Sequence, residues 1–194
     1  MNSIEFDYLL NIYQKEYDSN IWYYSGDDNN IRYILGEKGE HPLIIIGINP
    51  STAKPNNLDP TLRQVRKKAI EYGYDSYIMM NIYPERTNNP KLIHKSKDFN
   101  IHEENLKAFK YIFDNISNIE IWAAWGANIE KRKYLFDCLK DIISLSKGYS
   151  VKWMKRGNWK HPHHPLYLSD EYKLESFDID KYIMKKNFIN SFYN

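Results

Sequence analysis

The most constraining feature of the sequence is an uninterrupted apolar run, Leu43 to Ile48. A strand with one face in water alternates polar and apolar residues, whereas this run has no polar side chain on either face. It therefore predicts a strand buried on both sides, as in a parallel sheet. Short segments of the same β-rich kind recur along the chain at 77–82, 119–124 and 149–154.

Helices are predicted to separate these strands. The pair Asp59-Pro60 suits a helix start, with Asp as the N-cap and Pro at the first helical position. Two more helices are expected at 101–114 and 127–146. Because strand and helix then alternate, the chain is predicted to adopt an α/β fold with a doubly wound, mainly parallel central sheet flanked by helices.

Two further elements are expected before the first buried strand. They are an N-terminal helix at 3–17 and a hairpin with strands at 21–24 and 31–35, joined by a turn-rich segment. The sequence contains no internal repeat, low-complexity tract or Gly/Ser-rich linker, and its 194 residues suit one domain, 1–194.

Composition narrows the class of protein. The only cysteine, Cys138, excludes an internal disulfide and fits a reducing cytosol. The N-terminus has no secretory pattern, and no apolar run reaches the roughly 18 residues that span a bilayer. The formal charge of +2 is too small for a protein that coats nucleic acid, so a polyanion site must come from local clusters. We expect a cytoplasmic monomer with no membrane partner.

Several common cofactor motifs are absent from the sequence. No GxGxxG follows a strand, and the chain has no GxxxxGK[ST] phosphate loop, no GxSxG nucleophile elbow and no second His at zincin spacing from His102. Dinucleotide-dependent enzymes and NTPases therefore have no support, and neither a cofactor nor a metal is expected.

In doubly wound folds, ligands bind at the carboxyl ends of the strands, and two asparagines follow apolar runs there. Asn49, in the segment GINPS, either forms a turn or holds a water or substrate at the sheet edge. Asn81 ends the second apolar run, where it could cap a turn or pair with the polar edge of a ligand. An amide offers both a donor and an acceptor, so it suits a nucleobase edge.

A histidine cluster follows the fourth strand, where His161, His163 and His164 lie within the segment WKHPHHPLY. Three histidines could bind a metal, but no Cys or carboxylate of ligand spacing lies beside them. A rigid loop with surface histidines is a second interpretation. We favour a third, hydrogen bonding to an anionic group, because imidazole can donate or accept near neutral pH.

Two basic clusters flank the same edge of the sheet. One lies in the helix that starts at Asp59, and the other precedes the histidines and is interleaved with Trp153 and Trp159. Charge runs are often only solvated faces, but basic residues mixed with tryptophan beside a candidate site suggest a surface for phosphates and stacked bases. The residues expected to contact DNA are Arg63, Lys67, Lys155, Arg156 and Lys160.

Together these motifs resemble those of the uracil-DNA glycosylase superfamily. They are more closely similar to a bacterial and phage family catalogued as a domain of unknown function. The shared motifs, within residues 31–169, are Arg32-Tyr33-Ile34-Leu35, Gly47 to Ala53, Asp59-Pro60-Thr61, Asn81, Trp125-Gly126 and His161 to Leu168. The resemblance implies the superfamily's doubly wound fold and its chemistry, in which a nucleotide is flipped out of double-stranded DNA and the bond between base and sugar is cut.

The resemblance also implies roles for individual residues. The segment GINPS is similar to a water-activating motif of mismatch-type glycosylases, so Asn49 would hold the attacking water, while Asn81 would hydrogen-bond the flipped pyrimidine. The histidine segment resembles one whose His stabilises the departing base, and an insertion leaves open whether His161 or His164 takes that role. Asp59 is interpreted mainly as a helix cap, or else as a carboxylate that stabilises the sugar cation.

The resemblance further bears on substrate size. Uracil-specific relatives have a Tyr where this chain has Ser51, and the Tyr ring blocks a base that carries a C5 substituent. The small Ser51 would admit a C5-modified cytosine, even glucosylated hydroxymethylcytosine. The other residues expected to line the substrate pocket are Gly47, Ile48, Pro50 and Trp125.

The leading expectation is a DNA glycosylase that excises a modified pyrimidine from phage DNA, leaving an abasic site. Two alternatives come from other classes: a non-catalytic module that binds DNA or a modified nucleotide, and a metal-dependent nuclease that uses the histidine cluster. An assay for abasic sites separates the first two, and activity in the presence of a chelator would remove the third.

Overall fold

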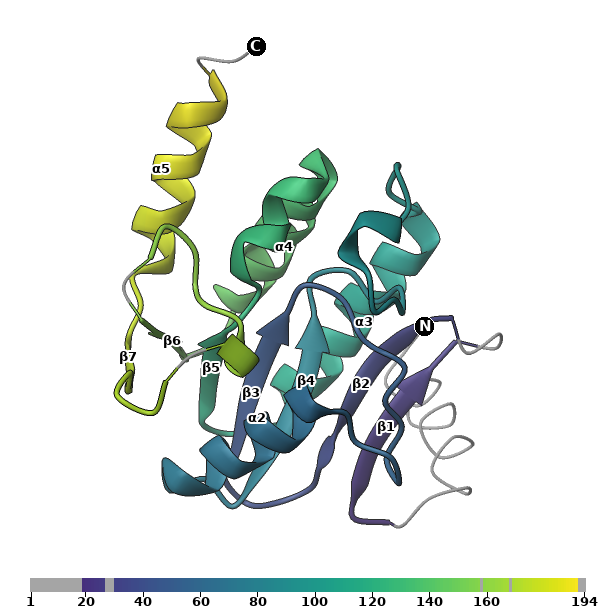
Figure 1. Ribbon diagram of the computed structural model, residues 1–194, viewed down its shortest axis with the longest axis vertical. Helices are drawn as coiled ribbons and strands as arrows, with labels where there is room; N and C mark the ends of the chain where they lie inside the picture. Colours follow the sequence, from purple (N-terminus) through teal and green to yellow (C-terminus); the bar gives the residue numbers. More distant parts are fainter. Residues whose placement is uncertain (1–18, 27–29, 158, 168, 192–194) are drawn as a thin grey trace.

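The computed structural model describes residues 19–26, 30–157, 159–167 and 169–191 (Figure 1). In this part of the chain seven strands form one sheet, in the order β1-β2-β4-β3-β5-β6-β7. The strands are β1 (Ile21–Ser25), β2 (Arg32–Glu37), β3 (Pro42–Gly47), β4 (Ser76–Asn81), β5 (Ile119–Ala123), β6 (Val151–Arg156) and β7 (Leu174–Ser176). The helix predicted at 3–17 lies outside the described residues.

The centre of the sheet is parallel and its edges are antiparallel. Strands β4, β3, β5 and β6 run in the same direction. Strands β1 and β2 form the predicted hairpin, and β2 pairs antiparallel with β4. The short strand β7, which was not predicted, pairs antiparallel with β6 at the other edge. The prediction of a parallel centre is therefore confirmed.

The central strand β3 is buried on both faces, as its apolar run predicts. Leu43 and Ile45 belong to one hydrophobic cluster, while Ile44 and Ile46 belong to the other. All four side chains are fully buried. Since successive residues of a strand point to opposite faces, the two clusters are the two layers of core on either side of the sheet.

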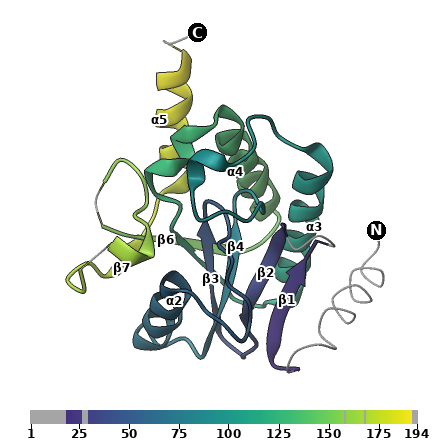
Figure 2. The ribbon, with the colours of Figure 1, turned by 45° about the vertical axis from the view of Figure 1, so that its right-hand side comes forward.

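Helices cover both faces of the sheet (Figures 1 and 2). Helix α2 (Pro60–Glu71) packs its Leu62, Val65 and Ala69 into the cluster of Leu43. Helices α3 (Phe99–Asn115), α4 (Lys133–Ser146) and α5 (Ile179–Ser191) contribute to the cluster of Ile44. None of the helices in the described ranges is both long enough and apolar enough to cross a membrane.

The order of the central strands creates a crevice at one point of the sheet. The chain passes from β3 through α2 to β4 on one side, and then through α3 to β5 on the other side of β3. The connections therefore diverge above the carboxyl ends of β3 and β5, where ligands of open α/β sheets bind. The loops after β3, β4, β5 and β6 all open at this edge.

The structure departs from the prediction in the segment 127–146. A 3-10 helix, Gly126–Lys131, comes first, and α4 begins only at Lys133. Arg132 between them is extended, with φ −138° and ψ 131°, so no continuous helix can pass through it. Strand β6 also begins and ends two residues later than predicted, and α5 was not predicted at all.

Close contact between strands β2 and β4 leaves no room for a side chain at Gly36. A Cβ atom there would lie 2.2 Å from the Tyr77 carbonyl oxygen and 2.8 Å from the Ile78 Cα atom. We expect Gly36→Ala to lower the free energy of unfolding by about 1–3 kcal/mol, because backbone atoms must shift. Gly148→Ala is the control, since its Cβ would meet nothing nearer than 3.6 Å. Urea denaturation of both variants tests this, and equal stability would contradict it.

Candidate functional site

A cavity of about 640 Å³ opens at the carboxyl ends of β3 and β5. This volume is within the range of small-molecule sites. The cavity is lined by residues of all four loops at this edge and by a few from the strands and α2. They include Arg32, Gly47, Ile48, Asn49, Ser51, Asp59, Met79, Thr87, Trp125, Glu130, Trp159, Lys160, His161, His163, His164 and Tyr167. Most of the residues predicted from the sequence therefore meet in one cavity.

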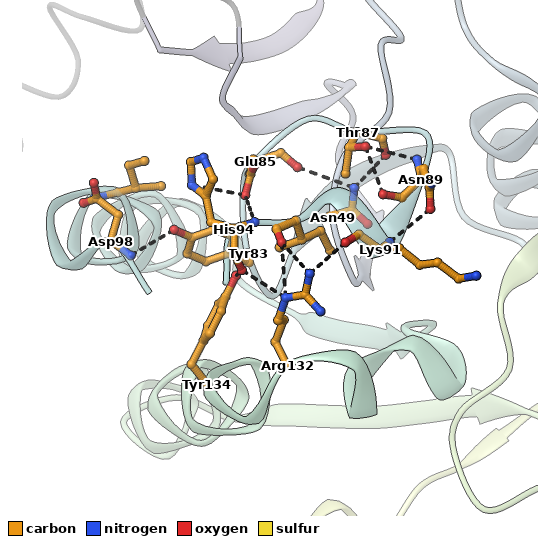
Figure 3. Close-up of polar contacts among 12 residues, drawn as sticks. Asn49, Tyr83, Glu85, Thr87, Asn89, Lys91, His94, Asp98, Arg132 and Tyr134 are labelled. Atoms are coloured by element: carbon orange, nitrogen blue, oxygen red, sulfur yellow. Dashed lines mark hydrogen bonds and ion pairs between the residues drawn. The ribbon is translucent and has the colours of Figure 1, made fainter. Parts of the chain in front are cut away.

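Asn49 lies half-buried in the loop after β3, with its amide nitrogen turned toward the loop after β4 (Figure 3). Its Nδ2 donates to the carbonyl oxygens of Thr87 at 2.8 Å, Pro50 at 3.1 Å and Glu85 at 3.4 Å. Its Oδ1 accepts no hydrogen bond from the described residues. The amide thus joins two loops by its nitrogen and leaves its oxygen for a ligand or water.

The loop after β4 is held by side chains on its far side as well (Figure 3). The Arg132 guanidinium donates to the carbonyl oxygens of Lys91, Ile93 and His94, and the Tyr134 hydroxyl donates to the His94 carbonyl at 2.9 Å. These bonds explain why the chain is extended at Arg132. They anchor the part of the loop that follows the cavity-lining residues Thr87 and Asn88.

Asp59 caps α2 and also lines the cavity. Its Oδ1 accepts a hydrogen bond from the Leu62 backbone N–H at 2.8 Å, so the predicted cap is confirmed. Burial lowers the pKa of two other groups of the cavity, Arg32 and His164, and the negative charge of Asp59 partly offsets that lowering. The carboxylate therefore acts electrostatically on a cation and on an imidazole, and it lines the cavity while it caps α2.

His161 is almost fully buried, and both of its ring nitrogens have partners. Nδ1 lies 2.8 Å from the Tyr182 hydroxyl, and Nε2 lies 3.0 Å from Glu130 Oε1. The Tyr182 oxygen accepts from Trp125 Nε1, and burial raises the pKa of Tyr182 so that it stays protonated. Its hydroxyl hydrogen is then free to donate to Nδ1, which places the imidazole proton on Nε2, facing Glu130.

His164 has one ring nitrogen left for a ligand, as does its neighbour His163, whose Nδ1 lies 3.1 Å from the His164 carbonyl oxygen. The Leu166 backbone N–H donates to its Nδ1 at 3.3 Å. Burial lowers the pKa of His164, and repulsion from His163 lowers it further, so the ring is neutral at pH 7. A neutral ring whose Nδ1 accepts carries its proton on Nε2. Within the described chain His164 therefore supplies an uncommitted N–H donor to the cavity.

Asn81 lies beneath the floor of the cavity rather than in it. It is fully buried, and neither its Nδ2 nor its Oδ1 has a partner in the described chain. It is paired in register with Gly47, where a Cβ atom would lie 2.9 Å from Asn81 Oδ1 and 2.6 Å from the Met79 methyl carbon. The absence of a side chain at Gly47 thus keeps the amide close to the cavity.

The remaining residues of the predicted substrate pocket have different positions. Ser51 and Ile48 line the cavity, and the Ser51 hydroxyl accepts a hydrogen bond from the Ala53 backbone N–H at 3.2 Å. Trp125 also reaches the cavity, although its side chain is fully buried among aromatic rings. Pro50 is buried and is not among the residues that line the cavity.

Arg156 does not lie on a surface that DNA could contact. It is fully buried, its Nε and Nη2 donate to the carbonyl oxygens of Tyr172 and Ser169, and its guanidinium lies over the Trp122 ring. The expectation that Arg156 contacts DNA is therefore wrong. The alternation of side chains along β6 turns Arg156 inward, and its hydrogen bonds hold the loop before β7.

The other basic residues expected to contact DNA keep some exposure. Arg63 and Lys67 are exposed on α2, and Lys160 is exposed at the rim of the cavity, 2.7 Å from Glu130. Lys155 is largely covered and lies 3.2 Å from Glu175. Of the three exposed cations, only Lys160 lines the cavity.

Sequence reasoning named Trp159 as part of a base-stacking surface but missed other residues of the site. Leu166 and Tyr167 are exposed apolar side chains at the opening, beside Trp159, and such side chains are typical of surfaces that bind flat rings. Tyr182 carries no sequence signal, because it lies 21 residues beyond its partner His161. Arg32 stands in a shared motif but received no role. Among the described residues no group of His, Cys, Asp and Glu could hold a metal ion.

These features define an α/β protein with a cavity lined by apolar and polar side chains at the switch point of its sheet. A family model described as "Protein of unknown function (DUF1643)" matches residues 32–166, and the chain belongs to this family. The matched range covers the motifs from Arg32 to His164. No curated protein matches the chain.

Two histidines that lose solvation on folding predict how stability depends on pH. Burial lowers the pKa of both His164 and His102 in the folded chain. The folded state then binds fewer protons than the unfolded state, so the free energy of unfolding falls as the pH drops below about 6.5. We expect His164→Gln to lose less stability than the wild type between about pH 7.5 and 5.5. Urea denaturation at both pH values measures this loss.

The control for this measurement is His94→Gln, which replaces an exposed histidine. It should lose as much stability as the wild type over the same pH range. Equal losses in the wild type and in His164→Gln would contradict the assignment of a neutral, half-buried His164.

Proposed function

We propose that the protein is a DNA glycosylase that hydrolyses the N-glycosyl bond of a C5-modified pyrimidine. The observation that carries the proposal is the meeting of Asn49, Asp59 and a neutral His164 in one cavity at the switch point of the sheet. The family assignment adds no activity of its own, so the proposal rests on the chemistry of these groups and on the motif resemblance.

The reaction needs charge stabilisation more than a strong base. Water adds its oxygen to C1′ of the sugar as the bond to the base breaks, the bonding electrons leave with the base, and the proton that the water loses ends on the released base. Positive charge therefore develops on the sugar and negative charge on the base. Preorganised donors and charges in a site shielded from water are effective for such a step.

His164 is suited to the departing base. Its Nε2–H is a neutral donor held in place by the Leu166 amide, and it can stabilise the negative charge that develops on a base oxygen. The structure favours His164 over His161 for this role, because both ring nitrogens of His161 already have partners.

Asn49 and Asp59 are suited to the sugar side of the reaction. The Asn49 Oδ1 can accept a hydrogen bond from the attacking water, while its Nδ2 is anchored to the loop after β4. The Asp59 carboxylate can stabilise the sugar cation without giving up its cap of α2. A base that displaces the Met79 methyl group would reach the unpartnered Asn81 amide.

The opening of the cavity suits a nucleotide flipped out of DNA. Trp159 and Tyr167 offer exposed rings on which bases can stack. Lys160 supplies positive charge at the rim of the cavity, and Arg63 and Lys67 supply it on the exposed face of α2, where the phosphate backbone could lie. We propose phage DNA with modified cytosines as the substrate, as the motif resemblance implies.

Base release from DNA with unmodified, hydroxymethylated and glucosylated cytosine tests the proposal. We expect abasic sites in modified DNA only, and we expect His164→Ala to slow their formation about 10²–10³-fold, as for loss of one oxyanion donor. His94→Ala should release base at the wild-type rate. Binding of DNA without base release by the wild type would instead favour a non-catalytic binding module.

Ser51 is predicted to set the size of the accepted base. Ser51→Tyr would place a ring in the cavity, so we expect release of glucosylated hydroxymethylcytosine to fall at least tenfold. Ser51→Ala keeps the volume and loses only the hydrogen bond from Ala53, so it should retain most activity. Competition between substrates in one reaction measures the preference, and an unchanged preference in Ser51→Tyr would refute the role.

A further inference from the structure

Arg32 is a buried cation that lines the cavity. It is the first residue of β2, and only 2% of its surface is exposed. It also begins the shared motif Arg32-Tyr33-Ile34-Leu35. Its Nη1 donates to the Ala53 carbonyl oxygen at 3.1 Å. Its Nε is buried and has no hydrogen-bond partner in the described chain.

A second guanidinium, that of Arg86, converges on the same carbonyl. Arg86 Nη1 donates to Ala53 O at 2.9 Å and to Ser51 O at 3.2 Å, and its Nη2 donates to the Tyr23 hydroxyl at 2.8 Å. Its Nε is also buried without a partner in the described chain. Two cations therefore share one acceptor and have unused donors.

No carboxylate of the described chain lies within ion-pair distance of either arginine. Asp59 attracts Arg32 electrostatically, but its Oδ1 is committed to the cap of α2. Burial, followed by repulsion from Arg86, lowers the pKa of Arg32 to about 9. Buried charges are costly unless they are paired, so the two arginines carry an excess of positive charge that an anion would offset.

Holding a loop does not explain the pair. Arg132 and Arg156 each hold a loop through backbone carbonyls, and each does so alone. The loop at 51–53 has two arginines instead of one, and Arg32 lines the cavity whereas Arg156 does not.

We propose that Arg32, supported by Arg86, forms an oxyanion subsite that binds a phosphate group of the nucleotide substrate. The planar guanidinium fork matches the oxygens of a phosphate. This inference rests on the proposed function, since it names the part of a nucleotide that the subsite takes. The phosphate is either the terminal group of a mononucleotide or a diester of the DNA backbone.

Calorimetric binding of deoxycytidine 5′-monophosphate, deoxycytidine and inorganic phosphate tests the subsite. We expect the monophosphate to bind at least tenfold more tightly than the nucleoside, and Arg32→Gln to remove about ten- to a hundredfold of that affinity. Arg156→Gln is the matched control, a buried arginine outside the cavity, and should bind like the wild type. Equal affinity for nucleotide and nucleoside would overturn the subsite if DNA binding is also unchanged when the phosphates beside the modified base are made neutral.

A binding experiment with DNA distinguishes the two sources of phosphate. Oligonucleotides with a neutral methylphosphonate on either side of the modified base should bind less tightly to the wild type if the diester is the ligand. Arg32→Gln should then be insensitive to the same replacement. Should Arg32→Gln not fold, Arg32→Lys keeps the charge and loses the fork, and it should show a partial loss. Unchanged binding of both the monophosphate and the methylphosphonate DNA by a folded Arg32 variant would refute the proposal.

The two proposals fail in different ways. If modified DNA releases no base while monophosphate binding depends on Arg32, the glycosylase proposal is wrong and the subsite stands. If base is released and Arg32→Gln binds and turns over like the wild type, the subsite is wrong and the glycosylase proposal stands.

Discussion

The burial of β3 on both faces is the constraint on which the rest of the structure depends. Its four central side chains alternate between the layer of α2 and the layer of α3 and α4. A strand buried in this way needs parallel neighbours with helical crossovers. Those crossovers bring the loops after β3, β4, β5 and β6 to one edge, so the position of the cavity follows from the apolar run at 43–48.

Backbone carbonyls of the loops are held by side-chain donors throughout the site. Asn49 holds the loop after β4 from one side, and Arg132 holds it from the other. Arg32 and Arg86 do the same for the loop after β3. Buried carbonyls need such partners where no strand or helix supplies them, and the result is a set of cavity walls ordered before any ligand arrives.

Sequence patterns predicted those features of the structure that depend on residues close together in the chain. The strands other than β7, the hairpin and the Asp59 cap were predictable because each depends on a few neighbouring residues. The break at Arg132 was not, because it depends on carbonyls about 40 residues earlier in the chain. The inward direction of Arg156 and the partners of His161 were missed for the same reason: charge and spacing do not show which side chains meet in three dimensions.

The contact between His161 and Tyr182 has a consequence for the boundary of the functional unit. The family match ends at residue 166, yet Tyr182 of α5 accepts the Trp125 hydrogen bond and contacts His161 inside the matched range. A fragment that ends at residue 166 would lose the Tyr182 hydroxyl. The buried Trp125 Nε1 and His161 Nδ1 would then lose their hydrogen-bond partner. The final helix is thus part of the architecture of the site, and relatives that differ there would have to satisfy the same two groups by another residue.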